Sequence, residues 1–140
     1  MKILVSPLGM SPGLLFSALY HVKPDFLFCL TSEKGKERLP DIMEKAGYMG
    51  GYSVFLVDDP FTAFHLTEKV WESLKDWLVS EAEVFVNITG GTTALQYLVQ
   101  KTAERLENQG FSVKTIALID RRSRSEQENN PYVPGEILYL

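Results

Sequence analysis

Short apolar segments alternate with helical patterns along the whole of this 140-residue chain, and this alternation constrains the fold more than any other feature. The apolar segments are continuous and rich in β-branched or aromatic residues, as are strands buried on both faces of a parallel sheet. They predict strands at Lys2–Ser6, Asp25–Leu30, Ser53–Val57, Glu83–Ile88 and Val113–Ile119, and a shorter last strand at Glu136–Leu140.

Between these segments, apolar residues recur at helical spacing. The pattern predicts helices at Pro12–Val22, Pro40–Ala46, Thr62–Val79 and Thr93–Asn108. Strand–helix alternation implies right-handed βαβ crossovers, so we expect a single α/β domain over residues 1–140 with a Rossmann-like, doubly wound and mainly parallel sheet. The polar stretch Arg121–Gly135 carries Asn-Asn-Pro and Pro-Gly turn signals and is expected to form an irregular loop.

Composition excludes several classes of function. The formal net charge of −4 disfavours a broad basic surface, so we expect no DNA partner. No apolar stretch approaches the roughly 20 residues that span a membrane, and the first strand is too short for a signal peptide, so a soluble cytoplasmic protein is expected. The single Cys29 and the separated His21 and His65 form no zinc motif, and dinucleotide and P-loop glycine motifs are absent. We therefore expect no metal and no cofactor.

The most informative local feature is the junction between the fourth predicted strand and the helix at Thr93–Asn108. Asn87 and Ile88 lead into Thr89-Gly90-Gly91-Thr92-Thr93. A strand that turns through glycines into a helix presents free N–H groups and the positive end of the helix dipole, which together bind anions. The hydroxyls of Thr89, Thr92 and Thr93 surround this point. Alternatively, the glycines serve only the turn, and Thr93 and Gln96 form a capping box.

Ligands of doubly wound sheets bind beyond the carboxyl ends of the strands. Residues that follow the other predicted strands should therefore share this edge: Leu8, Gly9, Met10 and Ser11, then Thr31, then Asp58, and finally Arg121 and Arg122. Each has a structural alternative. Ser11 before Pro12 fits a helix N-cap, Asp58 fits a cap or a turn, and the arginines fit a solvated loop.

Two segments together indicate a family. Leu4 to Gly13, read with Asn87-Ile88-Thr89-Gly90-Gly91-Thr92-Thr93, resembles the CRISPR-associated Rossmann-fold (CARF) domains, which sense cyclic oligoadenylates made by type III CRISPR systems. The closing Asp120-Arg121-Arg122 and Pro131 to Glu136 are also similar to the end of such a domain. The resemblance covers essentially the whole chain. One departure is Thr93, where many members carry Lys, so that Arg121 or Arg122 would have to supply a cationic phosphate contact.

Many CARF proteins carry a fused ribonuclease marked by a closely spaced Arg and His, and this chain has no such pair. A domain of this type without an effector resembles a ring nuclease, which cleaves the cyclic messenger and ends the antiviral response. The resemblance implies attack of a ribose 2′-hydroxyl on the neighbouring phosphodiester, giving a 2′,3′-cyclic phosphate without a metal ion. It implies a C2 homodimer around one ring, since cyclic tetra-adenylate is two-fold symmetric.

On this basis the expected catalytic residues are Ser11, Thr92, Thr93 and Arg121. The expected ligand contacts are Leu8, Gly9, Met10, Ser11, Thr31, Asp58, Asn87, Thr89, Gly90, Gly91, Thr92, Thr93, Gln96, Arg121 and Arg122. Two other functions stay open: a non-catalytic cyclic oligoadenylate sensor or sponge that acts through a partner protein, and a Rossmann-like domain for another nucleotide.

Overall fold

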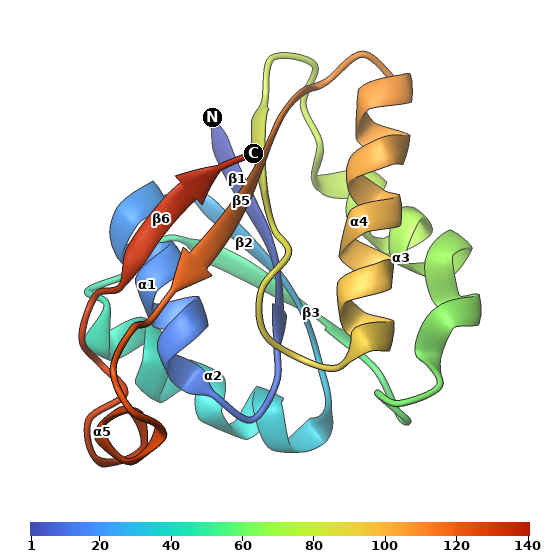
Figure 1. The fold of residues 1–140 in the computed structure, drawn as a ribbon. Helices are drawn as coiled ribbons and strands as arrows, with labels where there is room; N and C mark the ends of the chain where they lie inside the picture. Colours follow the sequence, from blue (N-terminus) through green and yellow to red (C-terminus); the bar gives the residue numbers. More distant parts are fainter.

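A computed structural model describes all 140 residues and contains one sheet of six strands in the order β3-β2-β1-β4-β5-β6 (Figure 1). Neighbouring strands are parallel except β6, which runs antiparallel to β5. The strands are β1 (Lys2–Leu8), β2 (Phe26–Thr31), β3 (Gly51–Leu56), β4 (Glu83–Asn87), β5 (Ser112–Ile119) and β6 (Glu136–Tyr139). Every predicted strand is confirmed, with ends that differ by at most two residues.

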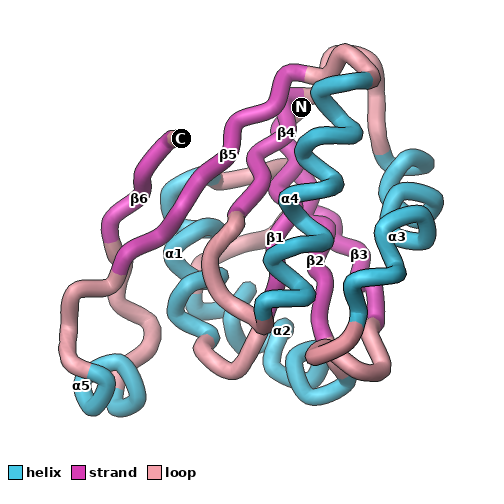
Figure 2. Tube along the Cα trace, turned by 45° about the vertical axis from the view of Figure 1, so that its right-hand side comes forward, coloured by secondary structure: helices cyan, strands magenta, loops and turns pink.

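Helices cover both faces of the sheet (Figures 1 and 2). They are α1 (Pro12–Val22), α2 (Glu33–Lys45), α3 (Thr67–Leu74), α4 (Thr93–Asn108) and the short α5 (Arg124–Asn129). Alternate residues of β1 divide the core, because successive side chains of a strand point to opposite faces. Ile3 and Val5 pack with α3 and α4, whereas Leu4 packs with α1 and α2. The doubly wound, mainly parallel fold is therefore as predicted.

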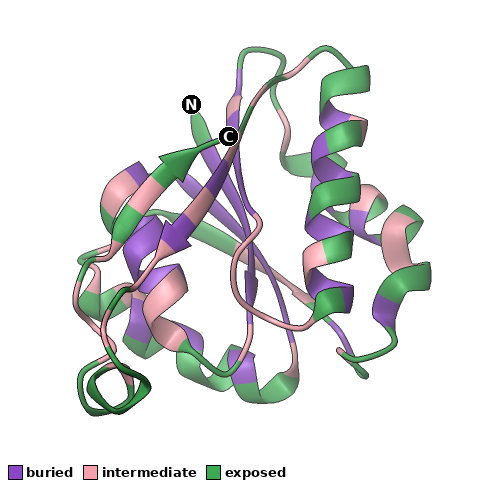
Figure 3. Ribbon diagram, in the orientation of Figure 1, coloured by how far each residue is buried: buried purple, intermediate pink, exposed green.

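Burial follows these layers. The central strands are almost entirely buried, and the outward faces of the helices are exposed (Figure 3). The carboxyl ends of the parallel strands and the amino ends of α1 and α4 share one edge of the sheet (Figures 1 and 2). Loops from both halves of the chain are thereby brought to this edge.

The second helix differs from its prediction. It begins at Glu33, with Ser32 as N-cap accepting a hydrogen bond from the Gly35 N–H at 3.4 Å, and it continues through Pro40. Proline normally ends or kinks a helix, because it lacks an N–H and its ring crowds the preceding turn. Here Pro40 is exposed, while Leu39 and Ile42 are buried in the core, and their burial holds the helix together.

Two further segments correct the prediction. The expected helix Thr62–Val79 is a 3₁₀ turn at Ala63–Leu66, then α3, then a 3₁₀ turn at Lys75–Trp77. In the second turn, Trp77 stacks on Phe26 at 4.6 Å between ring centroids. The expected irregular loop contains α5, which Ser123 caps by accepting from the Glu126 N–H at 3.2 Å.

Candidate anion-binding site at the switch in strand order

The candidate site lies between β1 and β4, where the strand order of the sheet reverses direction. β1 and β4 are neighbours at the centre of the sheet, and β1 leads into α1 on one face while β4 leads into α4 on the other. The two connections, residues 9–11 and residues 88–92, therefore leave the sheet side by side. This is the position at which open α/β sheets bind ligands.

The two connections touch through glycine backbones. A Cβ placed on Gly9 would lie 2.6 Å from the Cα and 2.8 Å from the N of Gly91, so no side chain fits there. Gly90 and Gly91 have φ of +87° and +74°, in the left-handed region that favours glycine. The Cβ position of Gly91 points toward Leu95 and Pro7, so a side chain there would enter the protein rather than the site.

This contact concentrates free hydrogen-bond donors. The backbone N–H groups of residues 9–11 and 90–92 find no acceptor within the protein. Both segments lead directly into helix N-termini, which add a positive partial charge. The edge therefore presents a group of unpaired N–H donors to whatever lies against it, as an anion-binding site requires.

A buried polar network supports the turn from below. Asn87 is fully buried and donates to Ser6 Oγ at 3.0 Å. Its Oδ1 accepts from the N–H and hydroxyl of Thr89, at 3.0 and 2.6 Å, and Thr89 Oγ1 in turn accepts from the Leu118 N–H at 3.1 Å. Asn87 and Thr89, predicted as ligand contacts, thus have the geometry of residues that hold the loop in place.

The capping prediction for α4 is wrong by one residue. Thr92, not Thr93, is the N-cap: its hydroxyl accepts from the Leu95 N–H at 3.2 Å and donates to the Pro60 carbonyl at 2.5 Å. Thr93 is the first helical residue and is exposed. Gln96 donates to the Gly90 carbonyl at 3.2 Å, which fixes the glycine turn.

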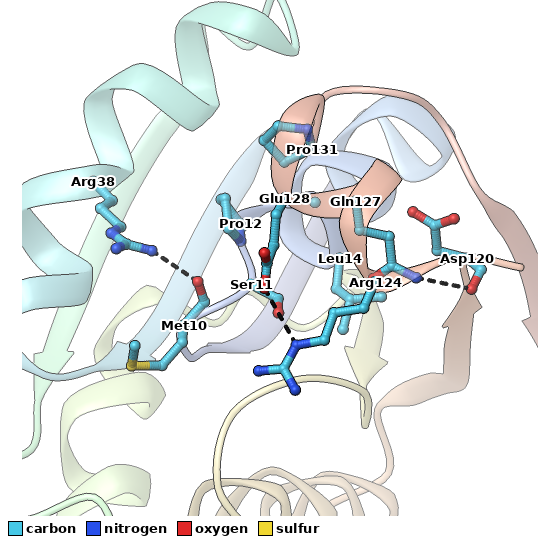
Figure 4. A pocket seen from close by; sticks show the side chains of 11 residues that line it. Met10, Ser11, Pro12, Leu14, Arg38, Asp120, Arg124, Gln127, Glu128 and Pro131 are labelled. Atoms are coloured by element: carbon cyan, nitrogen blue, oxygen red, sulfur yellow. Dashed lines mark hydrogen bonds and ion pairs between the residues drawn. The ribbon is translucent and has the colours of Figure 1, made fainter. Parts of the chain in front are cut away.

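Ser11 occupies the predicted N-cap position before Pro12, yet its side chain makes no capping hydrogen bond. It is exposed at a hollow of about 390 Å³, seen in Figure 4. The hollow is lined by the α1 amino end, α2, the end of β5 and α5, through Met10, Ser11, Pro12, Gly13, Leu14, Arg38, Asp120, Arg124, Gln127, Glu128 and Pro131. The Ser11 hydroxyl is therefore free to act on a ligand.

Two arginines line this hollow, and neither was predicted as a contact. Arg38 of α2 donates to the Met10 carbonyl at 2.7 Å, and Arg124 of α5 pairs with Glu128 at 3.2 Å. In Figure 4 their guanidinium groups reach toward the loop of Met10 and Ser11 from different elements. Sequence reasoning missed Arg38 because α2 was expected to begin only at Pro40; the recurrence of Gly35, Leu39 and Ile42 at helical spacing was the available signal.

The two arginines predicted as ligand contacts, Arg121 and Arg122, instead bind residues outside the Ser11 loop. Arg121 pairs with Glu136 and lines a different hollow, beside Val133 and Pro134. Arg122 binds Asp120 at 2.7 Å and the Asn130 carbonyl at 2.8 Å. The Arg122 hydrogen bond, helped by its charge and backbone N–H, lowers the pKa of Asp120 although partial burial opposes the shift. Arg122 thus anchors the β5–α5 connection.

The remaining predicted ligand contacts are either buried or exposed. Leu8 and Thr31 are buried, and Thr31 Oγ1 donates to the Leu8 carbonyl at 2.7 Å, which joins the ends of β1 and β2. Asp58 is exposed at the end of β3 and forms no hydrogen bond or ion pair. The structure therefore brings together Gly9, Met10, Ser11 and the turn of residues 90–93, and leaves Leu8 and Thr31 beneath them.

Comparison with known proteins rests on structure alone, because no protein-family model and no curated protein matches the chain. Enterococcus italicus Csm6 bound to cyclic hexa-2′-fluoro-hexa-dAMP aligns over 100% of this chain with a TM-score of 0.69 and 13% identity. Can2 from Sulfobacillus thermosulfidooxidans in complex with cyclic tetra-adenylate aligns over 100% of this chain with a TM-score of 0.67 and 16% identity. A type III CRISPR defence DNA nuclease activated by cyclic oligoadenylate aligns over 83% of this chain with a TM-score of 0.60 and 16% identity.

These likenesses define the fold class. The chain has the fold of a CARF domain, as the sequence resemblance predicts. It spans 42%, 35% and 18% of the three matched chains, so it corresponds to one part of each. None of its helices combines the length and apolar character needed to cross a membrane, and no group of three or more His, Cys, Asp or Glu side chains is placed to hold a metal ion.

Proposed function

We propose that this protein binds a cyclic oligoadenylate, with cyclic tetra-adenylate as the preferred ring, at the edge where Gly9 meets Gly91. The observation that carries the proposal is the pair of connections whose six loop N–H groups lack protein acceptors and adjoin two helix N-termini. Donors of this kind suit phosphodiester oxygens. The structural neighbours bound to cyclic oligoadenylates support this choice of anion.

In this proposal, Arg38 and Arg124 supply the cationic phosphate contacts, because position 93 carries threonine where many CARF domains carry lysine. Both line the hollow beside Ser11, whereas Arg121 and Arg122 do not. The hollow, at about 390 Å³, lies at the small end of the roughly 300–1,000 Å³ found for ligand pockets. It is too small for a whole cyclic oligonucleotide, which supports a C2 homodimer in which two copies share one ring. We place this complex in the cytoplasm, without DNA.

We further propose that the protein cleaves the ring. A ribose 2′-hydroxyl attacks its neighbouring phosphorus, the 5′-oxygen leaves with a proton, and a 2′,3′-cyclic phosphate forms. The nucleophile belongs to the substrate, so no metal is required in this scheme, and positioning the two oxygens in line can contribute several kcal/mol, up to roughly 7–11. The unbonded Ser11 hydroxyl is suited to orient the attacking group, and the turn of residues 90–92 to stabilise the developing negative charge.

This scheme narrows the catalytic candidates. Ser11 and Thr93 are exposed at the site, and Thr93 forms no side-chain hydrogen bond. The hydroxyl of Thr92 is already used as donor and acceptor, and Arg121 pairs with Glu136 outside the hollow. We therefore propose Ser11 and Thr93 as catalytic residues, with Thr92 as a positioning residue.

One observation favours the second candidate, a sensor or sponge that binds without cleavage. The carboxylates in the hollow are committed to arginines: Asp120 to Arg122, with a lowered pKa, and Glu128 to Arg124. The lowered pKa makes Asp120 a weak base at neutral pH, whereas a general base works best with a pKa near the operating pH.

The test is incubation of the purified protein with cyclic tetra-adenylate in EDTA, followed by chromatography and a calorimetric binding titration. Linear products ending in 2′,3′-cyclic phosphate are expected. Tight binding without products would establish the sensor instead. Absence of binding to cyclic oligoadenylates together with binding of a mononucleotide would replace both by another nucleotide-binding function.

A further inference from the structure

The connection between β3 and α3 presents a phenylalanine to solvent. Phe61 is 75% exposed, an unusual state for a large apolar ring, whose burial ordinarily contributes a substantial part of folding energy. Phe61 belongs to neither hydrophobic cluster of the core and pairs with no other aromatic ring. By contrast, the exposed Phe64 packs edge-on against Tyr97, with 5.5 Å between ring centroids.

Hydrogen bonds on both sides of Phe61 fix the backbone of the turn that carries it. The carboxylate of Asp59 accepts from the Phe61 N–H at 3.0 Å and from the Thr62 hydroxyl at 2.9 Å. The carbonyl of Pro60, the residue immediately before, accepts from the Thr92 hydroxyl at 2.5 Å. Phe61 is thus presented by an ordered turn rather than by a loose loop.

The Pro60–Thr92 bond also fixes where this turn lies. Thr92 is the N-cap of α4 and ends the Gly90-Gly91 turn, so the residue before Phe61 is tied directly to the end of the proposed phosphate contacts. Figures 1 and 2 both show the β3–α3 connection next to the first turn of α4. The hollow beside Ser11 lies on the other side of the Gly9–Gly91 contact, where α1 and α2 pack. An exposed ring and the arginines thus flank the free donors.

We propose that Phe61 is a stacking platform for a nucleobase of the bound ligand. This inference rests on the proposed function and deepens it, because it assigns the adenine of the nucleotide whose phosphate lies against residues 90–92. Aromatic side chains next to phosphate contacts are the usual means of holding single-stranded bases, since every base has a π-face. An ordered backbone on both sides of the ring reduces the freedom that the turn loses on binding.

The test measures equilibrium binding of fluorescently labelled cyclic tetra-adenylate to the wild type and to Phe61→Ala, Phe61→Trp and Phe64→Ala. Light scattering gives the mass of each variant, and circular dichroism checks its fold. Phe61→Ala is expected to weaken binding about 5- to 160-fold, the range seen when a stacking ring is removed. Phe61→Trp should bind like the wild type, and its indole fluorescence should be quenched by the ligand. The control variant Phe64→Ala should bind the labelled ligand with the affinity of the wild type.

Each outcome of these measurements supports or overturns the stacking role of Phe61. Wild-type affinity in Phe61→Ala, with the wild type binding well, overturns the stacking role and leaves the proposed function intact. Weakened binding together with a change in mass also overturns it, because Phe61 would then belong to an interface between copies. If the wild type itself fails to bind, the proposed function fails and the stacking role with it.

Discussion

Replacing Gly9 by alanine tests the central contact of the site. The added Cβ would lie 2.6 Å from Gly91 Cα, and ordinary contact begins at 3.4 Å, so the two connections must separate by about 0.8 Å. The three nearest atoms are all backbone atoms of Gly91 and cannot rotate away. Overpacking of this kind costs about 1–3 kcal/mol, which corresponds to a melting temperature lower by roughly 3–10 °C in a domain of this size. Such a separation moves the N–H groups of one connection out of hydrogen-bond distance of a shared phosphate, and because one hydrogen bond to a charged group is worth about 1.5–3 kcal/mol, affinity for cyclic tetra-adenylate should fall at least about tenfold.

Urea unfolding and calorimetric binding at a temperature where all variants are folded would measure both effects. Gly47→Ala is the matched control. Gly47 lies in the turn after α2, with φ of +66° and no atom within 4 Å of an added Cβ. Its replacement should cost about 1 kcal/mol through backbone strain alone and leave binding unchanged. A Gly9→Ala protein with the stability and affinity of the wild type would refute the close contact as the basis of the site.

Three further predictions concern single side chains. Ser11→Ala should reduce turnover of cyclic tetra-adenylate while changing the free energy of unfolding by less than about 0.5 kcal/mol, because Ser11 makes no capping bond; equal losses in turnover and stability would contradict this. Thr92→Val should cost about 1–2 kcal/mol in urea unfolding, since it removes the α4 cap and the bond to Pro60, and an unchanged midpoint would show that neither bond contributes. The folded-state pKa of Asp120 is lowered, so its stabilising pairing with Arg122 is fully present above its unfolded pKa of about 3.9 and is lost as the pH falls through the folded value. Unfolding midpoints should therefore differ between the wild type and Asp120→Asn at pH 6, and the difference should begin to shrink only as the pH falls below about 4, toward the lowered folded pKa; a gap that stays constant with pH would refute the ionic origin.

The sheet could be predicted from sequence because its signal is local and strong. Strands buried on both faces appear as continuous apolar runs, and the turn residues between them mark their ends. The helices were harder to predict. The helix predicted at Pro40–Ala46 begins seven residues too late, because burial of Leu39 and Ile42 carries α2 across a proline that ordinarily ends or starts a helix. The helix α5 lacks any buried residue, so no apolar pattern could reveal it.

The sheet edge that carries the candidate site could be predicted, but the contacts of its side chains could not. Gly9, Gly90 and Gly91 were correctly placed at one edge, because parallel strands end together. Which polar side chains are free depends on contacts between distant segments. Asn87 is bound to Ser6, and Arg122 to Asn130, and neither partner can be inferred from spacing. The same limit hid Arg38, whose place at the hollow follows only from the packing of α2 beside α1.

The pairing of β1 with β4 has a consequence for the order of folding. Lys2 lies opposite Glu83 in the register, so the first and the fourth strand meet only after most of the chain is available. Chains fold from the amino terminus as they are synthesised, and contacts between distant residues form slowly. The loop of residues 9–11 can form early beside β2, but its counterpart at 90–92 leaves the ribosome much later. A chain that ends before residue 90 therefore lacks half of these loop donors, so the proposed ligand site becomes complete only after β4 and the start of α4 have been made.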